Sequence, residues 1–310
     1  MLDVYIAKTI VTLNRSQPEA TAIAVRDGMI VEVGSLSSLE PWLLREPHVI
    51  HRAFESDVMV PGFIDPHLHP AMAAVILPMH FITAMPWSLP WREVPATVTP
   101  EAFDREMVRI LAEVDDEITI FWGHHDLWHG AMHRSRIDQL TGDRPVVVWN
   151  RSFHELHMNH ACMVHLGIDE VSAQHRKQVD LDAGRFYENG LGFAISRLNP
   201  FILEDARFRQ GLERLREVVH FGGHTTIGDM AVGLFDFERE LRESRAIFGG
   251  PDTFFRVEQV PHGGVLTHGK SAEEALAQLS ILAAESGPKL TFRRSEEHTS
   301  ELQSPDHLVC

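Results

Sequence analysis

The feature that most constrains the fold is an alternation of strand and helix patterns that runs through the chain from residue 118 onward. Short apolar runs typical of buried strands occupy residues 118–122, 145–149, 225–230 and 253–260. Amphipathic helical patterns lie between or after them, at residues 204–220, 235–248 and 271–285. Strands separated by helices favour βαβ units and a parallel sheet. The sequence therefore predicts an α/β fold.

The N-terminal segment has a different pattern. Its apolar residues alternate over residues 4–13, 22–25 and 29–33, and Asp27-Gly28 is a strong hairpin-turn signal. We predict a small antiparallel β module over residues 1–57. A second domain then begins at residue 58 with the run VMVPGFID, which is typical of a strand buried on both faces.

Two segments of the second domain have clear local signals. Thr99 and Pro100 are typical of an N-cap and first helical residue, and the apolar residues that follow have helical spacing, so we predict a helix from Pro100. Residues 180–200 instead carry several glycines, which predicts an inserted loop or hairpin.

Charge and composition argue against two classes of partner. The 310-residue chain has 28 Lys and Arg against 44 Asp and Glu, a formal net charge of −16. Nucleic-acid binding depends on Lys and Arg that neutralise phosphates, so we expect no nucleic-acid partner. Residues 66–91 lack charged side chains, but five prolines and three histidines interrupt them. A lipid-facing helix tolerates such residues poorly, so we expect no membrane span.

Cysteine content indicates a reducing compartment. The two cysteines, Cys162 and Cys310, do not form a disulfide framework, and the N-terminus has no signal-peptide pattern. We therefore expect a cytoplasmic location. At 44% hydrophobic residues the chain has enough apolar side chains for a large core. These features make no prediction about the oligomeric state.

The strongest chemical motif is PGFIDPHLHP at residues 61–70. Side chains in a strand alternate between faces, so His67 and His69 project to the same side and reach one metal ion. Asp65 shares that face and is placed to support a ligand. The alternative is that both histidines are ordinary residues of an apolar strand, satisfied by hydrogen bonds.

The complete string resembles the first-strand signature of the amidohydrolase superfamily. Five further blocks resemble its amidohydrolase 3 family, which includes N-substituted formamide deformylase-like enzymes. These blocks are WGHHDLWHG (122–130), LTGDRPVVVWNRSFHELHMNHACM (140–163), GRFYENGL (184–191), GGHTTIGDM (222–230) and FRVEQVPHG (255–263). The resemblance spans residues 1–293.

The resemblance implies roles for five residues. His67 and His69 correspond to metal ligands. His154, and more weakly Glu155 and Asn159, correspond to a segment that faces the substrate. For Asn159 the alternative is a helix N-cap before residues 161–166, and the sequence does not decide between the two.

The resemblance also implies the architecture, a (β/α)8 TIM-type barrel with the metal-dependent hydrolase fold. Residues 1–57 would be one half of a composite β-sandwich, residues 58–293 an incomplete barrel, and residues 71–220 the family's large insertion. The remaining ligands and the general base would come from later strands, so we expect the chain itself to be truncated and inactive. Lys289 is interpreted as the end of a loop before a strand.

The activity implied is hydrolysis of carbon–nitrogen bonds other than peptide bonds in a small-molecule substrate. A divalent metal ion, with zinc expected, would activate water for this reaction. Another reaction of the same superfamily, or a non-catalytic metal- or ligand-binding protein, remains an alternative. The sequence identifies neither the general base nor the substrate.

Two other histidine patterns are weaker. His154-Glu155-Leu156-His157 lacks the spacing of the zincin motif, in which the second histidine comes one position later. His125 and His129 have helical spacing, but flanking glycines and aromatics favour a loop at a pocket wall or the surface.

The C-terminal segment has no apolar period. From residue 294 the string RSEEHTSELQS resembles the conceptual translation of a common sequencing adapter. We therefore expect residues 294–310 not to be native protein.

Overall fold

The computed structural model describes residues 1–174 and 176–293. The adapter-like string and Cys310 lie outside these residues. The chain divides into two compact units, residues 1–63 and the remainder from Ile64. In the described ranges, no helix combines the length and apolar composition needed to cross a bilayer.

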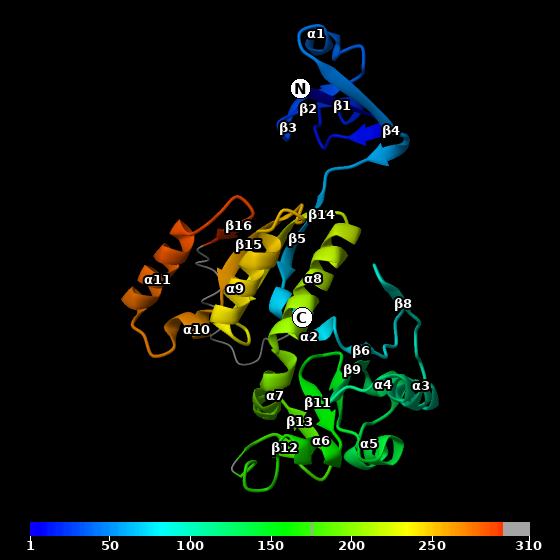
Figure 1. Ribbon diagram of the computed structural model, residues 1–310, viewed down its shortest axis with the longest axis vertical. Coiled ribbons are helices and arrows are strands. Elements are labelled where there is room, and N and C mark those ends of the chain that lie inside the picture. Colours follow the sequence, from blue (N-terminus) through cyan, green and yellow to red (C-terminus); the bar gives the residue numbers. More distant parts are fainter. Residues whose placement is uncertain (175, 294–310) are drawn as a thin grey trace. The chain divides into compact units, whose positions relative to one another are not determined.

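The first unit is a four-stranded sheet with the order β3-β2-β1-β4 (Figure 1). Its elements are β1 (Leu2–Val11), β2 (Glu19–Arg26), β3 (Met29–Gly34), α1 (Glu40–Leu43) and β4 (His48–Met59). The predicted hairpin is confirmed, because Asp27 and Gly28 link β2 to β3 with φ values of 51° and 76°. The prediction of a purely antiparallel module is wrong, since β1 pairs with β4 in parallel.

The second unit contains a four-stranded sheet with the order β16-β15-β14-β5. The strands are β5 (Phe63–Leu68), β14 (His224–Val232), β15 (Arg256–Pro261) and β16 (Leu290–Phe292). Pairs β14–β15 and β15–β16 are parallel, as the strand–helix alternation predicts. The sheet is open in the described residues, so a closed barrel remains a prediction.

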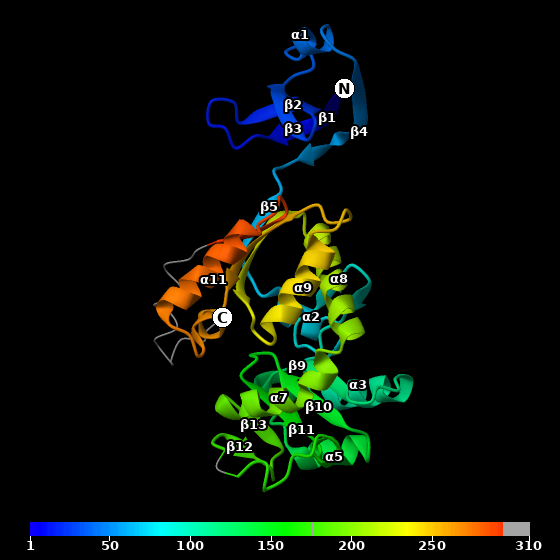
Figure 2. The same cartoon turned by 60° about the vertical axis from the view of Figure 1, so that its left-hand side comes forward.

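Helices accompany this sheet (Figure 2). They are α2 (Pro70–Ile76), α8 (Asp205–Phe221), α9 (Phe237–Phe248), α10 (Gly263–Thr267) and α11 (Ala272–Ala284). Helices α8 and α9 contact β14, and α11 contacts β16. Helix α2 lies against α8 at a very close approach, because a Cβ on Gly211 would be 1.9 Å from the carbonyl oxygen of Ala74. Gly211 therefore fixes the position of α2.

Strand β5 differs from its prediction. The run before His67 was expected to be buried on both faces, yet Phe63 and Ile64 are 56% and 68% exposed. The strand lies at the end of the sheet, where β14 is its neighbour on one side. An apolar run predicts burial on both faces only when other elements pack against both faces of the strand.

Residues 80–187 form a second, six-stranded sheet with the order β12-β13-β11-β10-β9-β6. Its strands are β6 (His80–Phe81), β9 (Thr119–His124), β10 (Val146–Asn150), β11 (Glu155–Met158), β12 (Val179–Asp180) and β13 (Arg185–Tyr187). A hairpin of β7 (Trp87–Leu89) and β8 (Arg92–Val94) lies in the same region of the sequence. The central strands β9 and β10 are buried almost throughout, as their apolar runs predict.

The helices of this region are α3 (Pro100–Glu113), α4 (Asp126–His129), α5 (Arg134–Thr141), α6 (His160–His165) and α7 (Asn189–Ile202). Helix α3 is confirmed, with Thr99 as its N-cap. The loop or hairpin predicted for residues 180–200 is only partly right, because α7 occupies most of it. Burial of Leu191, Ala194 and Leu198 at helical spacing outweighs the glycines.

Candidate functional site

His67 and His69 lie together at the C-terminal end of β5. His67 is in the strand, and His69 is the N-cap of α2, whose first residue is Pro70. Their ring centroids are 5.1 Å apart and the rings are edge to face, as expected for alternate residues on one face. The carboxylate of Asp65 accepts a hydrogen bond from the backbone N–H of His67 at 3.1 Å. Asp65 therefore fixes the backbone beneath this pair.

The imidazole of His69 is suited to bind a cation. Its Nδ1 is buried and has no hydrogen-bond partner among the described residues. Burial lowers the pKa of His69, and the neighbouring His67 and His262 lower it further. The ring is therefore neutral near pH 7, and neutral imidazole is the form that ligates metals. The donor set of His67 and His69 thus fits a divalent ion.

His262 lies near this pair and was missed by the sequence analysis. It directly follows β15, and its backbone N–H donates to the carbonyl of Val232 at the end of β14. Burial lowers the pKa of His262, and its Nδ1 has no hydrogen-bond partner in the part of the chain that the structure describes. Its position just after a strand was the available signal, because site residues commonly follow parallel strands.

A buried acid on β14 was also missed. Asp229 is 5% exposed and lies opposite Gln259 of β15 in the sheet register. Burial, with a smaller contribution from Glu240, raises the pKa of Asp229 to about 7. One carboxylate oxygen is 3.4 Å from the backbone N–H of Ala231. Perturbed carboxyl groups of this kind are common at functional sites.

The described residues do not by themselves complete a metal centre. No group of three or more His, Cys, Asp or Glu side chains arranged to hold a metal ion occurs within residues 1–174 and 176–293. Lys289, the residue just before β16, is not placed as a metal ligand either. Its amino group donates a hydrogen bond to the carbonyl of Gly250. His67 and His69 are therefore two candidate ligands rather than a full set.

His154 and Glu155 follow β10, as predicted, but make different contacts. His154 is half-exposed, and its Nδ1 lies 3.3 Å from a carboxylate oxygen of Glu188. Glu155 accepts a hydrogen bond from Nε of Arg185 at 2.9 Å and lies 3.6 Å from Nε2 of His157. The Glu155 carboxylate thus links β11 to β13.

Asn159 is the N-cap of α6, which was the alternative interpretation of this residue. Its carboxamide oxygen accepts from the backbone N–H groups of Cys162 at 2.9 Å and Val146 at 3.0 Å. Its amide group donates to the hydroxyl of Thr141 and the carbonyl of Arg144. The side chain is fully buried and its hydrogen-bonding capacity is filled by the protein.

His125 and His129 do not form a metal-binding pair. The expected loop includes one helical turn, α4, with His125 as its N-cap. His129 is fully buried rather than at a pocket wall or the surface, with Nδ1 accepting from the backbone N–H of His125 and Nε2 bonded to the carbonyl oxygen of Thr97. His129 is therefore a core histidine whose ring nitrogens are both used.

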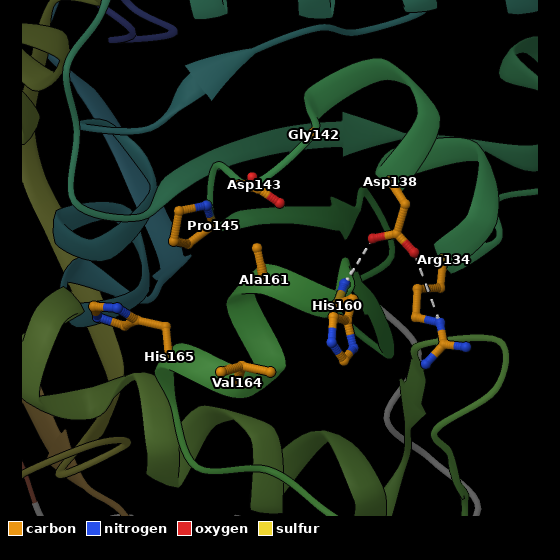
Figure 3. A pocket seen from close by; sticks show the side chains of 9 residues that line it. All are labelled: Arg134, Asp138, Gly142, Asp143, Pro145, His160, Ala161, Val164 and His165. Carbon is orange, nitrogen blue, oxygen red and sulfur yellow. Dashed lines mark hydrogen bonds and ion pairs between the residues drawn. The ribbon is translucent and has the colours of Figure 1, made fainter.

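A cavity of about 800 Å³ lies beside α5 and α6. Figure 3 shows Arg134, Asp138 and His160 along its wall, where Asp138 accepts from the backbone N–H of His160 at 2.8 Å and lies 3.8 Å from Arg134. The carboxylate therefore links the two helices. None of the predicted site residues lines this cavity.

Comparison with known proteins relates the chain to a fold rather than to a family. No family model matches it. A 73-residue stretch, 24% of this chain and 15% of the relative, is 36% identical to the exoenzymes regulatory protein AepA of Pectobacterium carotovorum subsp. carotovorum.

Two crystal structures share the fold. They are uncharacterized metal-dependent hydrolases from Pyrococcus horikoshii OT3 and Pyrococcus furiosus, each 18% identical to this chain, with TM-scores of 0.65 and 0.64. Each match covers 94% of this chain but 53% and 55% of the respective structures. The chain therefore spans about half the length of the structures that it matches.

Proposed function

We propose that this chain is part of a metal-dependent hydrolase that cleaves carbon–nitrogen bonds other than peptide bonds, in amides or N-substituted formamides. The observation that carries the proposal is the His67 and His69 pair at the end of β5, in a chain whose fold matches two structures described as metal-dependent hydrolases. In this proposal β5, β14, β15 and β16 are the first four strands of a (β/α)8 barrel, with the site at their C-terminal ends.

His67 and His69 would hold one divalent ion, and we propose zinc. When bound, such an ion supplies an activated water and polarises the scissile carbonyl. The protein's part is to hold the two rings together at the end of β5. Asp65 does this for His67 through the backbone, and the start of α2 does it for His69.

The β10–β11 turn would contact the small-molecule substrate. His154 is half-exposed there, with Glu188 beside its ring. Glu155 and Asn159 would act indirectly, because the first is engaged by Arg185 and the second by the cap of α6. Glu155 would hold the turn that presents His154, and Asn159 would fix the opposite end of the β10–β11 hairpin.

The test is a hydrolysis screen on the full-length protein that contains this chain, prepared with zinc. The panel holds primary amides, N-substituted formamides, esters and lactones, and release of amine or acid is measured. We expect amine release that is lost in the His67→Ala/His69→Ala double variant. Turnover restricted to esters or lactones would contradict the C–N assignment, and bound zinc with no turnover of any compound would favour a non-catalytic metal-binding protein.

A further inference from the structure

An apolar cavity of about 330 Å³ opens beside α2. Helix α2 contributes Met72 and Ile76, the end of β10 and the turn after it contribute Trp149 and Phe153, and the loop after β14 contributes Phe235. A cavity of about 150 Å³ is large enough to hold benzene. The cavity therefore has room for an aromatic ring together with a short chain.

One wall of the cavity is formed by α2, the helix that directly follows the proposed metal ligands. His69 is the N-cap of α2, and Met72 and Ile76 follow it by three and seven residues. At a helical rise of about 1.5 Å per residue, these two side chains start about 5 and 10 Å along the axis from His69. A substrate whose scissile carbonyl lies at His69 can therefore reach Met72 with a substituent that begins a few bonds from that carbonyl.

Two polar atoms in the lining lack partners. The indole N–H of Trp149 and the carboxamide oxygen of Asn199 are buried, and neither has a hydrogen-bond partner in residues 1–174 and 176–293. Trp149 as a whole is 2% exposed. Each atom has almost no accessible surface, so neither is open to the cavity, and the cavity presents a mainly apolar surface to its occupant.

The wall also contains a strained residue. Phe153 has a φ of 64°, a left-handed conformation that is unfavourable for a bulky side chain. The ring is held between Trp122, with centroids 5.6 Å apart, and Trp149, with centroids 6.3 Å apart. Such conformations persist where the surroundings impose them, and they cluster at ligand-binding sites.

We propose that this cavity binds an apolar, ring-sized substituent of the substrate, so that the preferred substrates are arylalkyl amides rather than small aliphatic ones. The inference rests on the proposed function in placing the scissile carbonyl at the end of β5. The lining favours an aromatic ring, because Trp149, Phe153 and Phe235 offer ring faces and edges.

The test measures binding without turnover. Calorimetric titration of 3-phenylpropanamide and of propanamide is performed on the chain with no metal added. Two variants narrow the cavity, and both change residues that line it. Gly192→Leu adds a side chain where a Cβ meets nothing within 4 Å. Leu234→Trp enlarges a side chain that is 36% exposed. The matched control is Gly287→Leu, where a Cβ also meets nothing within 4 Å and which lies outside the lining.

We expect the wild-type chain to bind 3-phenylpropanamide more tightly than propanamide. At least one narrowing variant should weaken binding of the aryl amide roughly tenfold or more, and Gly287→Leu should leave it unchanged. Melting curves confirm that the variants are folded. Equal affinity for the two amides, or unchanged affinity for the aryl amide in both narrowing variants, would overturn the inference.

The outcomes for the cavity and for the proposed function are separate. Selective binding of the aryl amide by a full-length protein that hydrolyses no amide would keep the cavity assignment and remove the function. Amide hydrolysis with no dependence on Gly192 or Leu234 would keep the function and remove the cavity assignment.

Discussion

The rings of His67 and His69 lie edge to face with their centroids 5.1 Å apart, at the point where β5 ends and α2 begins. The pair is held from three directions: Asp65 fixes the backbone of His67, Pro70 starts the helix after His69, and α2 is packed against α8. The histidine pair is therefore placed by the fold itself rather than by a loop.

Replacing Gly211 by Ala should destabilise the protein, because a new Cβ would lie 1.9 Å from the carbonyl oxygen of Ala74 in α2. We expect a loss of about 1–3 kcal/mol in the free energy of unfolding, measured by urea titration. The matched control is Gly192→Ala in α7, where the added methyl meets nothing within 4 Å and should be neutral or stabilising. Equal stability of Gly211→Ala and the wild type would show that α2 and α8 are not packed this closely.

Replacing Asn159 by Ala should cost about 3 kcal/mol of stability, because it removes an N-cap and leaves buried backbone groups without partners. Thr99→Ala is the comparison, since Thr99 caps α3 with one hydrogen bond and should cost about 1 kcal/mol. Both values come from thermal or urea unfolding. A stability loss in Asn159→Ala no larger than in Thr99→Ala would contradict the structural role assigned to Asn159.

Replacing His154 by Ala should change function rather than stability. The ring is half-exposed and its contact with Glu188 is open to solvent, so the free energy of unfolding should change by no more than about 0.5 kcal/mol. If His154 contacts the substrate, KM for an amide should rise in the full-length protein. An unchanged KM would remove His154 from the proposed site.

Asp229 should make stability depend on pH. Its pKa in the folded protein is raised to about 7, so between about pH 4 and 7 the folded state binds more protons than the unfolded state. Its contribution to stability is therefore favourable at acid pH and is lost as pH rises toward 7. Asp229→Asn should remove this pH dependence. The free energy of unfolding of the variant, relative to that of the wild type, should therefore be higher at pH 8 than at pH 4.

The control for this pH effect is Asp182→Asn, which removes one carboxylate from an exposed position. Urea midpoints of the three proteins are measured from pH 4 to 8. A wild-type and an Asp229→Asn curve that run parallel over this range would contradict a raised pKa for Asp229.

Much of the local structure was predictable because it depends on neighbouring residues. Thr99 with Pro100 specifies the start of α3, and Asp27-Gly28 specifies the first hairpin. Helix α7 was missed, because the glycines near its start are visible in the sequence whereas the burial of Leu198 is not. The exposure of Ile64 depends on whether another element packs against its face of β5, which local sequence does not specify.

The candidate site likewise has one part that neighbouring residues specify and one part that only the tertiary fold brings together. That His67 and His69 share a face follows from the strand period alone. His262 joins them only through the pairing of β14 with β15 and with β5, and β5 is distant from the other two strands in the sequence. The metal-binding role of His67 and His69 itself remains a prediction.

The most direct test of that role is the zinc content of the protein. The full-length protein that contains this chain and its His67→Ala/His69→Ala variant are dialysed against zinc and then against metal-free buffer, and bound metal is measured by plasma mass spectrometry. A His48→Ala/His268→Ala variant, which removes two exposed histidines, controls for nonspecific binding by other histidines. We expect zinc to be retained in the wild type and in the control but lost from the His67→Ala/His69→Ala variant. Zinc retained equally by all three proteins would contradict this expectation.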